Sequence, residues 1–205
     1  MSQTAVPVDQ PVAIETAPRT RGYSTAWWGM VVLITTESMV FLALLAAYFF
    51  VRAGASRWPL DGIAPPELYR SVIFSIILLG SSIPIFWMEY ALFRGRMREV
   101  KVTLLIAFLM GVAFLVNTMY DFANMEFGWR DNAYASLFYV IIGLHALHVF
   151  IGLLMSATVQ VKVWMGRVTP QQHTTPEVFA LYWHFVDGVW ILVFSSLILS
   201  PHLVR

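Results

Sequence analysis

The segment 134–161, YASLFYVIIGLHALHVFIGLLMSATVQV, decides the fold, because it contains no Asp, Glu, Lys or Arg. About 20 apolar residues in a helix cross the roughly 30 Å hydrocarbon core of a bilayer. Inside lipid the backbone must satisfy its own polar groups, so only helices and closed barrels span membranes. The segment lacks the period-two alternation of a barrel strand, and we therefore predict a transmembrane helix.

Four other apolar blocks have a similar length, and short links rich in Gly, Pro and charged residues separate all five. The predicted spans are 27–51, 69–93, 100–122, 134–161 and 178–199. We therefore predict an all-α integral membrane protein, a bundle of five transmembrane helices. The membrane unit is expected to cover 25–205, after a cytoplasmic tail (1–24) whose composition indicates disorder.

Local sequence predicts two features of the packing. Pro84, next to Gly80-Ser81-Ser82, should kink the second span, because proline lacks the N–H that a helix requires. Small residues four apart allow helices to approach closely. The pairs of this kind that we single out are Ala107 with Gly111 and Gly152 with Ser156.

The composition excludes several classes of function. Of the residues, 59% are apolar and 12% are charged, which leaves too few charges to cover a soluble surface. The formal net charge of +1 gives no support to binding of nucleic acid or of acidic substrates. The chain has no cysteine, so disulfides, iron–sulfur clusters, thiolate zinc sites and cysteine nucleophiles are all excluded.

Orientation is predicted from Lys and Arg, which gather in the cytoplasmic loops of membrane proteins. With the N-terminus inside, eight of these residues lie in the cytoplasm and five outside. The cytoplasmic set is Arg19, Arg21, Arg94, Arg96, Arg98, Lys101, Lys162 and Arg167. The outer set is Arg52, Arg57, Arg70, Arg130 and Arg205. The cluster at 94–101 lies in a short loop, where the rule applies best, so we predict the N-terminus inside and the C-terminus outside.

Five ionisable side chains lie deep within the predicted spans: Glu37, His145, His148, His184 and Asp187. A charged group at the centre of a bilayer costs on the order of 3 kcal/mol or more, so each needs a partner or a function. Glu37 lies about ten residues, or about 15 Å, into its helix and hence near the midplane. His145 and His148 share one helix face, as do His184 and Asp187. Glu37, His145, His148 and Asp187 lie at comparable depth on three helices, and we expect these four to face protein.

These residues leave three functions open. Axial histidines on two spans, such as His184 with His145 or His148, would make a b-type haem electron carrier. However, His145 and His148 on one face cannot both be axial ligands of the same haem. A proton-coupled transporter would use Glu37, but transporters usually have more spans and unwound helices at the midplane. A structural subunit, whose polar groups fix helix registry and partner contacts, agrees best with the pattern.

Five motifs resemble subunit III of the haem–copper respiratory oxidases. Residues 182–190, YWHFVDGVW, are similar to the family's YWHFVDxVW, and 143–152, GLHALHVFIG, to its GxHxLHVxxG. Residues 36–41, TESMVF, are similar to an (S/T)ExxFF element with a glutamate in the same place. Residues 57–59, RWP, resemble the WPP loop with one proline fewer. Residues 120–122, YDF, resemble a YEY element with aspartate for glutamate.

This resemblance, over residues 25–200, implies an accessory subunit that holds no redox centre, metal or other cofactor. It implies a main contact with catalytic subunit I, which carries the haems and copper, and further contacts with subunit II. It also implies structural phospholipids in a cleft between the first two spans and the last three. We expect Trp58, Trp183 and Arg52 at that cleft. The implied role is to protect subunit I during turnover and to support proton uptake, in the inner membrane of a bacterium.

The electron donor is less directly implied. Cytochrome c oxidases usually carry the glutamate seen here as Glu37, whereas quinol-oxidising members often lack it. The resemblance therefore favours the cytochrome c type. A quinol oxidase subunit III and a nitric oxide reductase accessory subunit are the alternatives within the superfamily. Glu37 is itself open to two interpretations, as a structural strut or as a residue linked to proton uptake.

Overall fold

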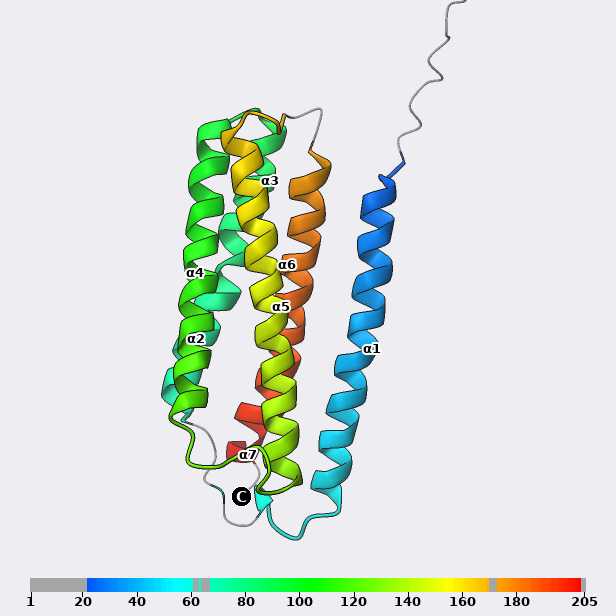
Figure 1. The fold of residues 1–205 in the computed structure, drawn as a ribbon, viewed down its shortest axis with the longest axis vertical. Helices are drawn as coiled ribbons and strands as arrows, with labels where there is room; N and C mark the ends of the chain where they lie inside the picture. Colours follow the sequence, from blue (N-terminus) through cyan, green and yellow to red (C-terminus); the bar gives the residue numbers. More distant parts are fainter. Residues whose placement is uncertain (1–21, 61–62, 64–66, 170–172, 204–205) are drawn as a thin grey trace, which may run out of the picture.

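The computed structural model describes residues 22–60, 63, 67–169 and 173–203. It contains five stretches of helix long and apolar enough to cross a membrane (Figure 1), which confirms the predicted fold class. The predicted tail, up to residue 21, lies outside the described residues. The helices are α1 (Thr25–Ala53), α2 (Leu68–Gly80), α3 (Ser82–Phe93), α4 (Met97–Ala123), α5 (Ala133–Trp164), α6 (Thr174–Val193) and α7 (Ser200–Leu203). A π-helical segment, Phe194–Leu199, joins α6 to α7.

Side-chain caps and glycines set several of the helix ends. Ser24 Oγ accepts a hydrogen bond from the backbone N–H of Trp27 at the start of α1, and Asn132 Oδ1 caps α5 in the same way. Gly95 and Gly166 have φ values of 71° and 70°, a conformation that favours glycine. They turn the chain after α3 and α5, so these two spans end sharply.

The second span breaks at Ser81 into α2 and α3, and this confirms the predicted kink. Pro84 has no N–H to donate to the carbonyl of Gly80, so the regular ladder is interrupted there. The backbone N–H of Ser81 still bonds to the carbonyls of Ile77 and Leu78, at 3.1 and 2.9 Å. The break is therefore local, and α3 continues across the membrane.

The second span and the first lie on different sides of the bundle. α2 and α3 pack against α4 and α6, whereas α1 packs against α5 and α6 and stands apart along part of its length (Figure 1). α1 buries three side chains, Phe41, Leu45 and Tyr48, all in its second half. The expected grouping of the first two spans against the last three is therefore wrong, because polar contacts described below hold the second span to α6.

Candidate functional site: polar groups inside the bundle

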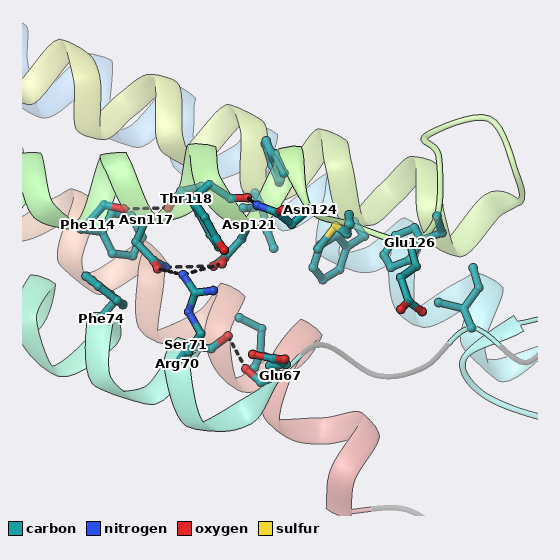
Figure 2. Close-up of a pocket in the computed structure, with 18 of the residues that line it drawn as sticks. Glu67, Arg70, Ser71, Phe74, Phe114, Asn117, Thr118, Asp121, Asn124 and Glu126 are labelled. Atoms are coloured by element: carbon teal, nitrogen blue, oxygen red, sulfur yellow. Dashed lines mark hydrogen bonds and ion pairs between the residues drawn. The ribbon is translucent and has the colours of Figure 1, made fainter.

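A cavity of about 770 Å³ opens at the end of the bundle where α4 ends and α2 and α5 begin (Figure 2). We call it the Arg70 cavity, after the guanidinium on its wall. Arg70 Nη2 donates a 2.8 Å hydrogen bond to Asn117 Oδ1 and lies 3.4 Å from Asp121 Oδ1. Asn117 Nδ2 in turn donates to Asp121 Oδ2 at 2.9 Å. The network joins the second and third spans.

Sequence reasoning missed this network, since it counted Arg70 as a loop charge and noted Asp121 only as part of the 120–122 motif. The signal was present in the sequence. Asn117 and Asp121 are four residues apart and therefore lie on one face of an otherwise apolar helix. Such a polar pair near the end of a span needs a partner, and Arg70 begins the neighbouring span at the same depth.

Two tryptophans of α6 bind the second span. Trp183 Nε1 donates a 2.8 Å hydrogen bond to Ser81 Oγ, and Trp190 Nε1 donates a 3.0 Å bond to Ser75 Oγ. All four side chains are buried. An indole N–H inside a membrane needs an acceptor, since neither water nor lipid tails supply one there. The spacing of the two tryptophans along α6 thus matches that of the two serines along α2 and its break.

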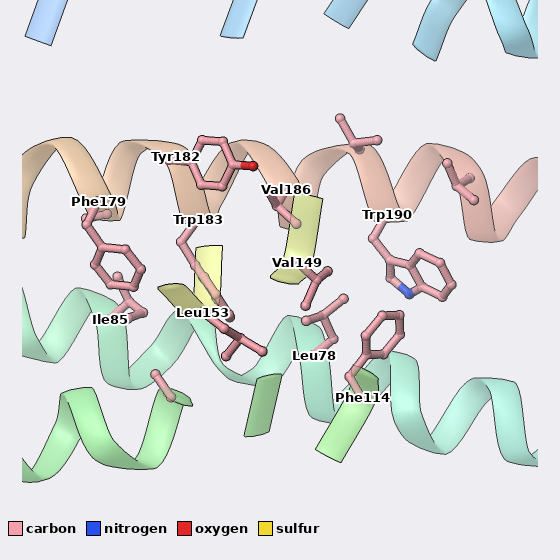
Figure 3. Close-up of a cluster of buried hydrophobic side chains, with 14 of the residues drawn as sticks. Leu78, Ile85, Phe114, Val149, Leu153, Phe179, Tyr182, Trp183, Val186 and Trp190 are labelled. Atoms are coloured by element: carbon pink, nitrogen blue, oxygen red, sulfur yellow. The ribbon is translucent and has the colours of Figure 1, made fainter. Parts of the chain in front are cut away.

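The indole of Trp183 is wedged between α4 and α5 within the buried cluster of Figure 3. A Cβ atom at Gly111 would lie 2.7 Å from Trp183 Cη2, and one at Gly152 would lie 2.9 Å from Cζ3. Both glycines were predicted to permit close packing, and both do so by making room for this ring. Trp183 is 1% exposed, which makes it a core residue.

His184 and Asp187 converge on one hydroxyl of the second span. Ser82 Oγ donates to Asp187 Oδ2, and His184 Nδ1 lies 3.1 Å from the same Oγ. A hydroxyl has a single hydrogen, so when it is given to Asp187 the Nδ1 of His184 must be the donor. The His184 ring also stacks on Phe86 with 4.2 Å between ring centroids. Two adjacent serines at the break thus hold three polar residues of α6.

Glu37 and His148 form a pair between the first and fourth spans. Glu37 Oε2 lies 3.3 Å from His148 Nε2, and His148 Nδ1 lies 2.8 Å from the carbonyl oxygen of Leu144. A carbonyl only accepts, so Nδ1 carries a proton and Nε2 faces the carboxyl group of Glu37. The side chain of His148 is 8% exposed and that of Glu37 is 34% exposed. Glu37 and His148 were predicted to lie at a similar depth in the membrane, and their contact agrees with this.

His145 is fully buried but binds no other polar group in the described part of the chain. Its ring packs against Trp190, with 4.7 Å between centroids, and against the edges of Phe114 and Phe41. His145 therefore faces protein, as predicted, but it does so as a ring in an aromatic cage. Among the described residues, neither ring nitrogen of His145 forms a hydrogen bond to a neighbouring helix.

The structure places the three residues expected at a lipid cleft in different surroundings. Trp183 belongs to the core, with 1% of its surface exposed. Trp58 Nε1 donates to Tyr48 Oη at 3.1 Å, and its ring packs on Tyr134. Arg52 Nη1 donates to Ser200 Oγ, which ties the end of α1 to α7. The polar groups of Trp58 and Arg52 thus have partners within the chain.

A different surface is apolar, as a lipid cleft should be. An apolar groove of about 290 Å³, which we call the α1 groove, opens where α1 diverges from α5 and α6. Its lining residues are Ala26, Met155, Thr158, Val159, Thr174, Thr175, Val178 and Phe179. No residue of the second span is among them, so the first span alone forms the separate wall.

Contacts within the bundle already engage two of the histidines expected as haem ligands. Both ring nitrogens of His148 already have partners, and Nδ1 of His184 is held by Ser82. Among the described residues, no three or more His, Asp or Glu side chains are grouped so that they could hold a metal ion. Ligation of a haem by His148 would require one of these contacts to break.

The fold and these contacts define a multi-pass helical membrane protein whose intramembrane polar groups bind one another. A family model described as "Cytochrome c oxidase subunit III" matches residues 16–200, and the chain belongs to this family. The resemblance drawn from the five motifs is thereby confirmed.

Individual relatives agree with this assignment. The chain is 35% identical over 173 residues to the cytochrome c oxidase subunit 3 of Thermostichus vulcanus, covering 82% of this chain and 84% of that one. It is 37% identical over 174 residues to the probable cytochrome c oxidase subunit 3 of Mycobacterium tuberculosis, with 82% and 84% covered. The corresponding protein of Loxodonta africana is 31% identical over 176 residues, with 83% and 67% covered.

Proposed function

We propose that this chain is the accessory subunit of an aerobic haem–copper oxidase of the cytochrome c type, and that it stabilises catalytic subunit I. Membership of the subunit III family supports a place in an oxidase complex. In this proposal the haems and copper belong to partner subunits, chiefly subunit I and subunit II. The complex lies in the inner membrane of a bacterium.

One observation carries the non-redox part of the proposal. The polar side chains of the motif 182–190 bind the serines of the second span. His184 and Asp187, which could be taken for metal or haem ligands, thus hold two spans together. These contacts hold the last span to the second, and a fixed arrangement of spans is what a subunit needs in order to support a larger partner.

We propose that the α1 groove holds the tails of a structural phospholipid. Its walls are formed mainly by aliphatic, aromatic and threonine side chains, and it lies within the length of the spans. Hydrocarbon tails fill such a groove without any demand for hydrogen bonds. Structural lipids here would join α1, which buries few of its own side chains, to the rest of the bundle.

The Glu37–His148 pair is proposed to act first as a strut and second as support for proton uptake. The strut role is supported by the 3.3 Å contact between Glu37 on the first span and His148 on the fourth, whose ring is held by the Leu144 carbonyl. The proton role is supported by the 3.3 Å contact between the carboxyl group and the imidazole and by the exposed third of the Glu37 side chain. The variants that separate these roles are described in the Discussion.

Purification through an affinity tag on this chain tests the proposed assembly. We expect subunits I and II to co-purify, with haem and copper in stoichiometric amounts and with rapid oxidation of reduced cytochrome c. Oxidation of quinol without oxidation of cytochrome c would establish the quinol oxidase alternative. Reduction of nitric oxide without consumption of oxygen would establish the reductase alternative. A haem that remains on the isolated chain after washing would overturn the non-redox assignment.

A further inference from the structure

The Arg70 cavity is not used by the proposed function, and it reaches deep into the bundle. Its mouth lies between the last turns of α4 and the first turns of α2 and α5 (Figure 2). Phe114 and Ile142 are both part of its lining. At about 1.5 Å per residue, these two residues lie only about 6 and 10 Å from the midpoints of α4 and α5, respectively. Half of the hydrocarbon core is about 15 Å thick, so the cavity enters the hydrocarbon region.

The mouth of the cavity is lined by charged groups, which require water. Five charged side chains lie in the lining: Glu67, Arg70, Asp121, Glu126 and Asp131. Ionised groups lose a large hydration energy when they meet only hydrocarbon, so acyl chains are unsuited to fill this end of the cavity. At about 30 Å³ per molecule, the volume of about 770 Å³ has room for on the order of twenty water molecules.

Polar groups continue along α4 from the mouth toward the centre. Asp121 is followed inward by Asn117 and Thr118, one turn deeper, and then by Phe114, as Figure 2 shows. Thr118 Oγ1 donates to the carbonyl oxygen of Phe114 at 3.0 Å. A hydroxyl that donates one hydrogen bond still has lone pairs that accept others. Water molecules can therefore bind along this wall of the cavity.

His145 lies directly behind the inner end of the cavity. Its ring packs against Trp190 and Phe114, with 4.7 and 5.9 Å between ring centroids, and both of these residues line the cavity. Ile142, also in the lining, precedes His145 by about one turn of α5. His145 is 0% exposed, and neither of its ring nitrogens has a hydrogen-bond partner among the described residues. A neutral imidazole carries one donor and one acceptor, and burial of both without partners is unfavourable.

We propose that the Arg70 cavity is a water-filled vestibule, open to the aqueous phase at the loop between α4 and α5, and that His145 binds water at its inner end. Trp190 is fixed by its hydrogen bond to Ser75, whereas the ring of Phe114 has no polar group that could fix it. A turn of the Phe114 ring therefore admits water to His145. Water then supplies the donor and the acceptor that the imidazole needs. The vestibule hydrates the centre of the bundle from one side of the membrane, and it does not depend on the proposed oxidase function.

Cysteine accessibility tests the vestibule, because the chain has no cysteine of its own. Thr118→Cys and Ile142→Cys place single cysteines in the lining of the full-length chain, within sealed membrane vesicles. Ile141→Cys is the matched control, because Ile141 is the neighbour of Ile142 on α5, is 0% exposed and is not among the lining residues. Asn124→Cys, at the exposed mouth, reports the side of the membrane that the loop faces. A charged, membrane-impermeant methanethiosulfonate is added to one side, and the mass of the purified chain measures modification.

We expect Thr118→Cys and Ile142→Cys to react from the same side as Asn124→Cys. Ile141→Cys should react at least about 100-fold more slowly than Ile142→Cys, because a thiol in apolar surroundings rarely forms the reactive thiolate. The variants at 141 and 142 remove the same volume from neighbouring positions. A general loosening of the fold would therefore affect both alike.

A second set of variants tests the inner end of the vestibule. His145→Cys should react slowly from the same side, and about tenfold faster when it is combined with Phe114→Leu, since the smaller side chain opens the aromatic wall. Val149→Cys is the control, because Val149 lies one turn farther along α5 and is 0% exposed. It should remain unreactive with either residue at position 114.

Three results would overturn the proposal. Equal rates for Ile142→Cys and Ile141→Cys, whether fast or slow, would show that the cavity is not a route for water. Reaction of Ile142→Cys only from the side opposite to that of Asn124→Cys would place the entrance elsewhere. An unreactive His145→Cys, with and without Phe114→Leu, would show that water stops at the aromatic wall and that His145 binds none.

Discussion

The indole Nε1 of Trp183 bonds to Ser81, the residue at which the second span breaks into two helices. The neighbouring Ser82 binds His184 and Asp187, so the break and the motif on α6 form one unit. A regular helix directs its backbone polar groups along its own axis. The side chains of Ser81 and Ser82 at the break form the polar contacts between the second span and the last span.

Removal of the Ser81 hydroxyl should weaken this unit measurably. In Ser81→Ala the N–H of Trp183 loses its acceptor in a place without water. We expect the chain to unfold more easily by about 1 kcal/mol, a typical upper value for hydrogen bonds inside membranes. Reversible unfolding in mixed micelles measures the difference. Ser195→Ala is the matched control, because the Ser195 hydroxyl bonds only to its own helix. Equal stability of the two variants would contradict the role of Ser81.

The close packing of Trp183 against Gly111 predicts a second effect. In Gly111→Ala the new methyl group would lie 2.7 Å from the indole, so the ring or the helix must move. Overpacking of this kind costs about 1–3 kcal/mol, partly offset by about 1 kcal/mol from the higher helix propensity of alanine. We expect a net loss of about 1 kcal/mol in the same unfolding assay.

Gly188→Ala provides the control for this variant. Gly188 also lies in a helix, but a Cβ atom there meets nothing within 4 Å. It should therefore leave stability unchanged or raise it slightly. A combination of Gly111→Ala with Trp183→Phe should lose less than the sum of the single changes, because the clash needs both groups. Additive losses would show that the indole is not the cause.

Substitution of Glu37 separates its two proposed roles. Because Nδ1 of His148 carries a proton, Nε2 can accept a hydrogen bond, and the amide of Glu37→Gln can donate one. This variant should assemble and oxidise cytochrome c at a near-normal rate. Glu37→Ala leaves Nε2 without a partner, and we expect faster loss of activity during sustained turnover.

Oxygen consumption by the purified complexes checks both variants of Glu37. A near-normal rate for Glu37→Gln supports the strut. A large immediate drop in rate for Glu37→Gln, with this chain still bound in the complex, would show instead that a titrating proton at Glu37 is required.

The orientation of the chain is open to a direct test. Five spans place the termini on opposite sides, and the Lys and Arg residues at 94–101 favour the cytoplasmic side for the turn after α3. Reporter fusions at Gln10 and Arg205 should report the cytoplasm and the exterior, respectively. Identical locations would mean that one span does not cross the membrane, and reversed locations would mean that the charge bias misleads here.

The number and ends of the spans could be predicted because they depend on local composition. The predicted span 134–161 is observed as Ala133–Trp164, and 100–122 as Met97–Ala123. The kink at Pro84 was predictable for the same reason, since a missing N–H is a property of one residue. The side of the bundle on which each span lies depends on contacts between distant residues, and there the expectation for the first two spans was wrong.

The site was predictable only in part. Residues such as Glu37 and Asp187 stood out because an ionisable group in lipid needs a partner, but the identity of that partner did not follow. Ser81 and Ser82 were noted only beside the predicted kink, and nothing in the sequence marked them as partners of α6, since serine is common in membrane helices. Trp183 was assigned to a lipid cleft, because tryptophan often lies at membrane interfaces. The two glycines that enclose it lie on other helices, so its burial could not be read from its own segment.

The central claim is that this chain stabilises a catalytic subunit without taking part in electron transfer. The most direct test compares the oxidase purified with this chain and the same oxidase purified without it, both supplied with reduced cytochrome c and oxygen. The account predicts equal haem content and a similar initial rate of oxygen consumption, followed by much earlier inactivation when the chain is absent. A loss of haem together with the chain, or an equal active lifetime of the two preparations, would contradict it.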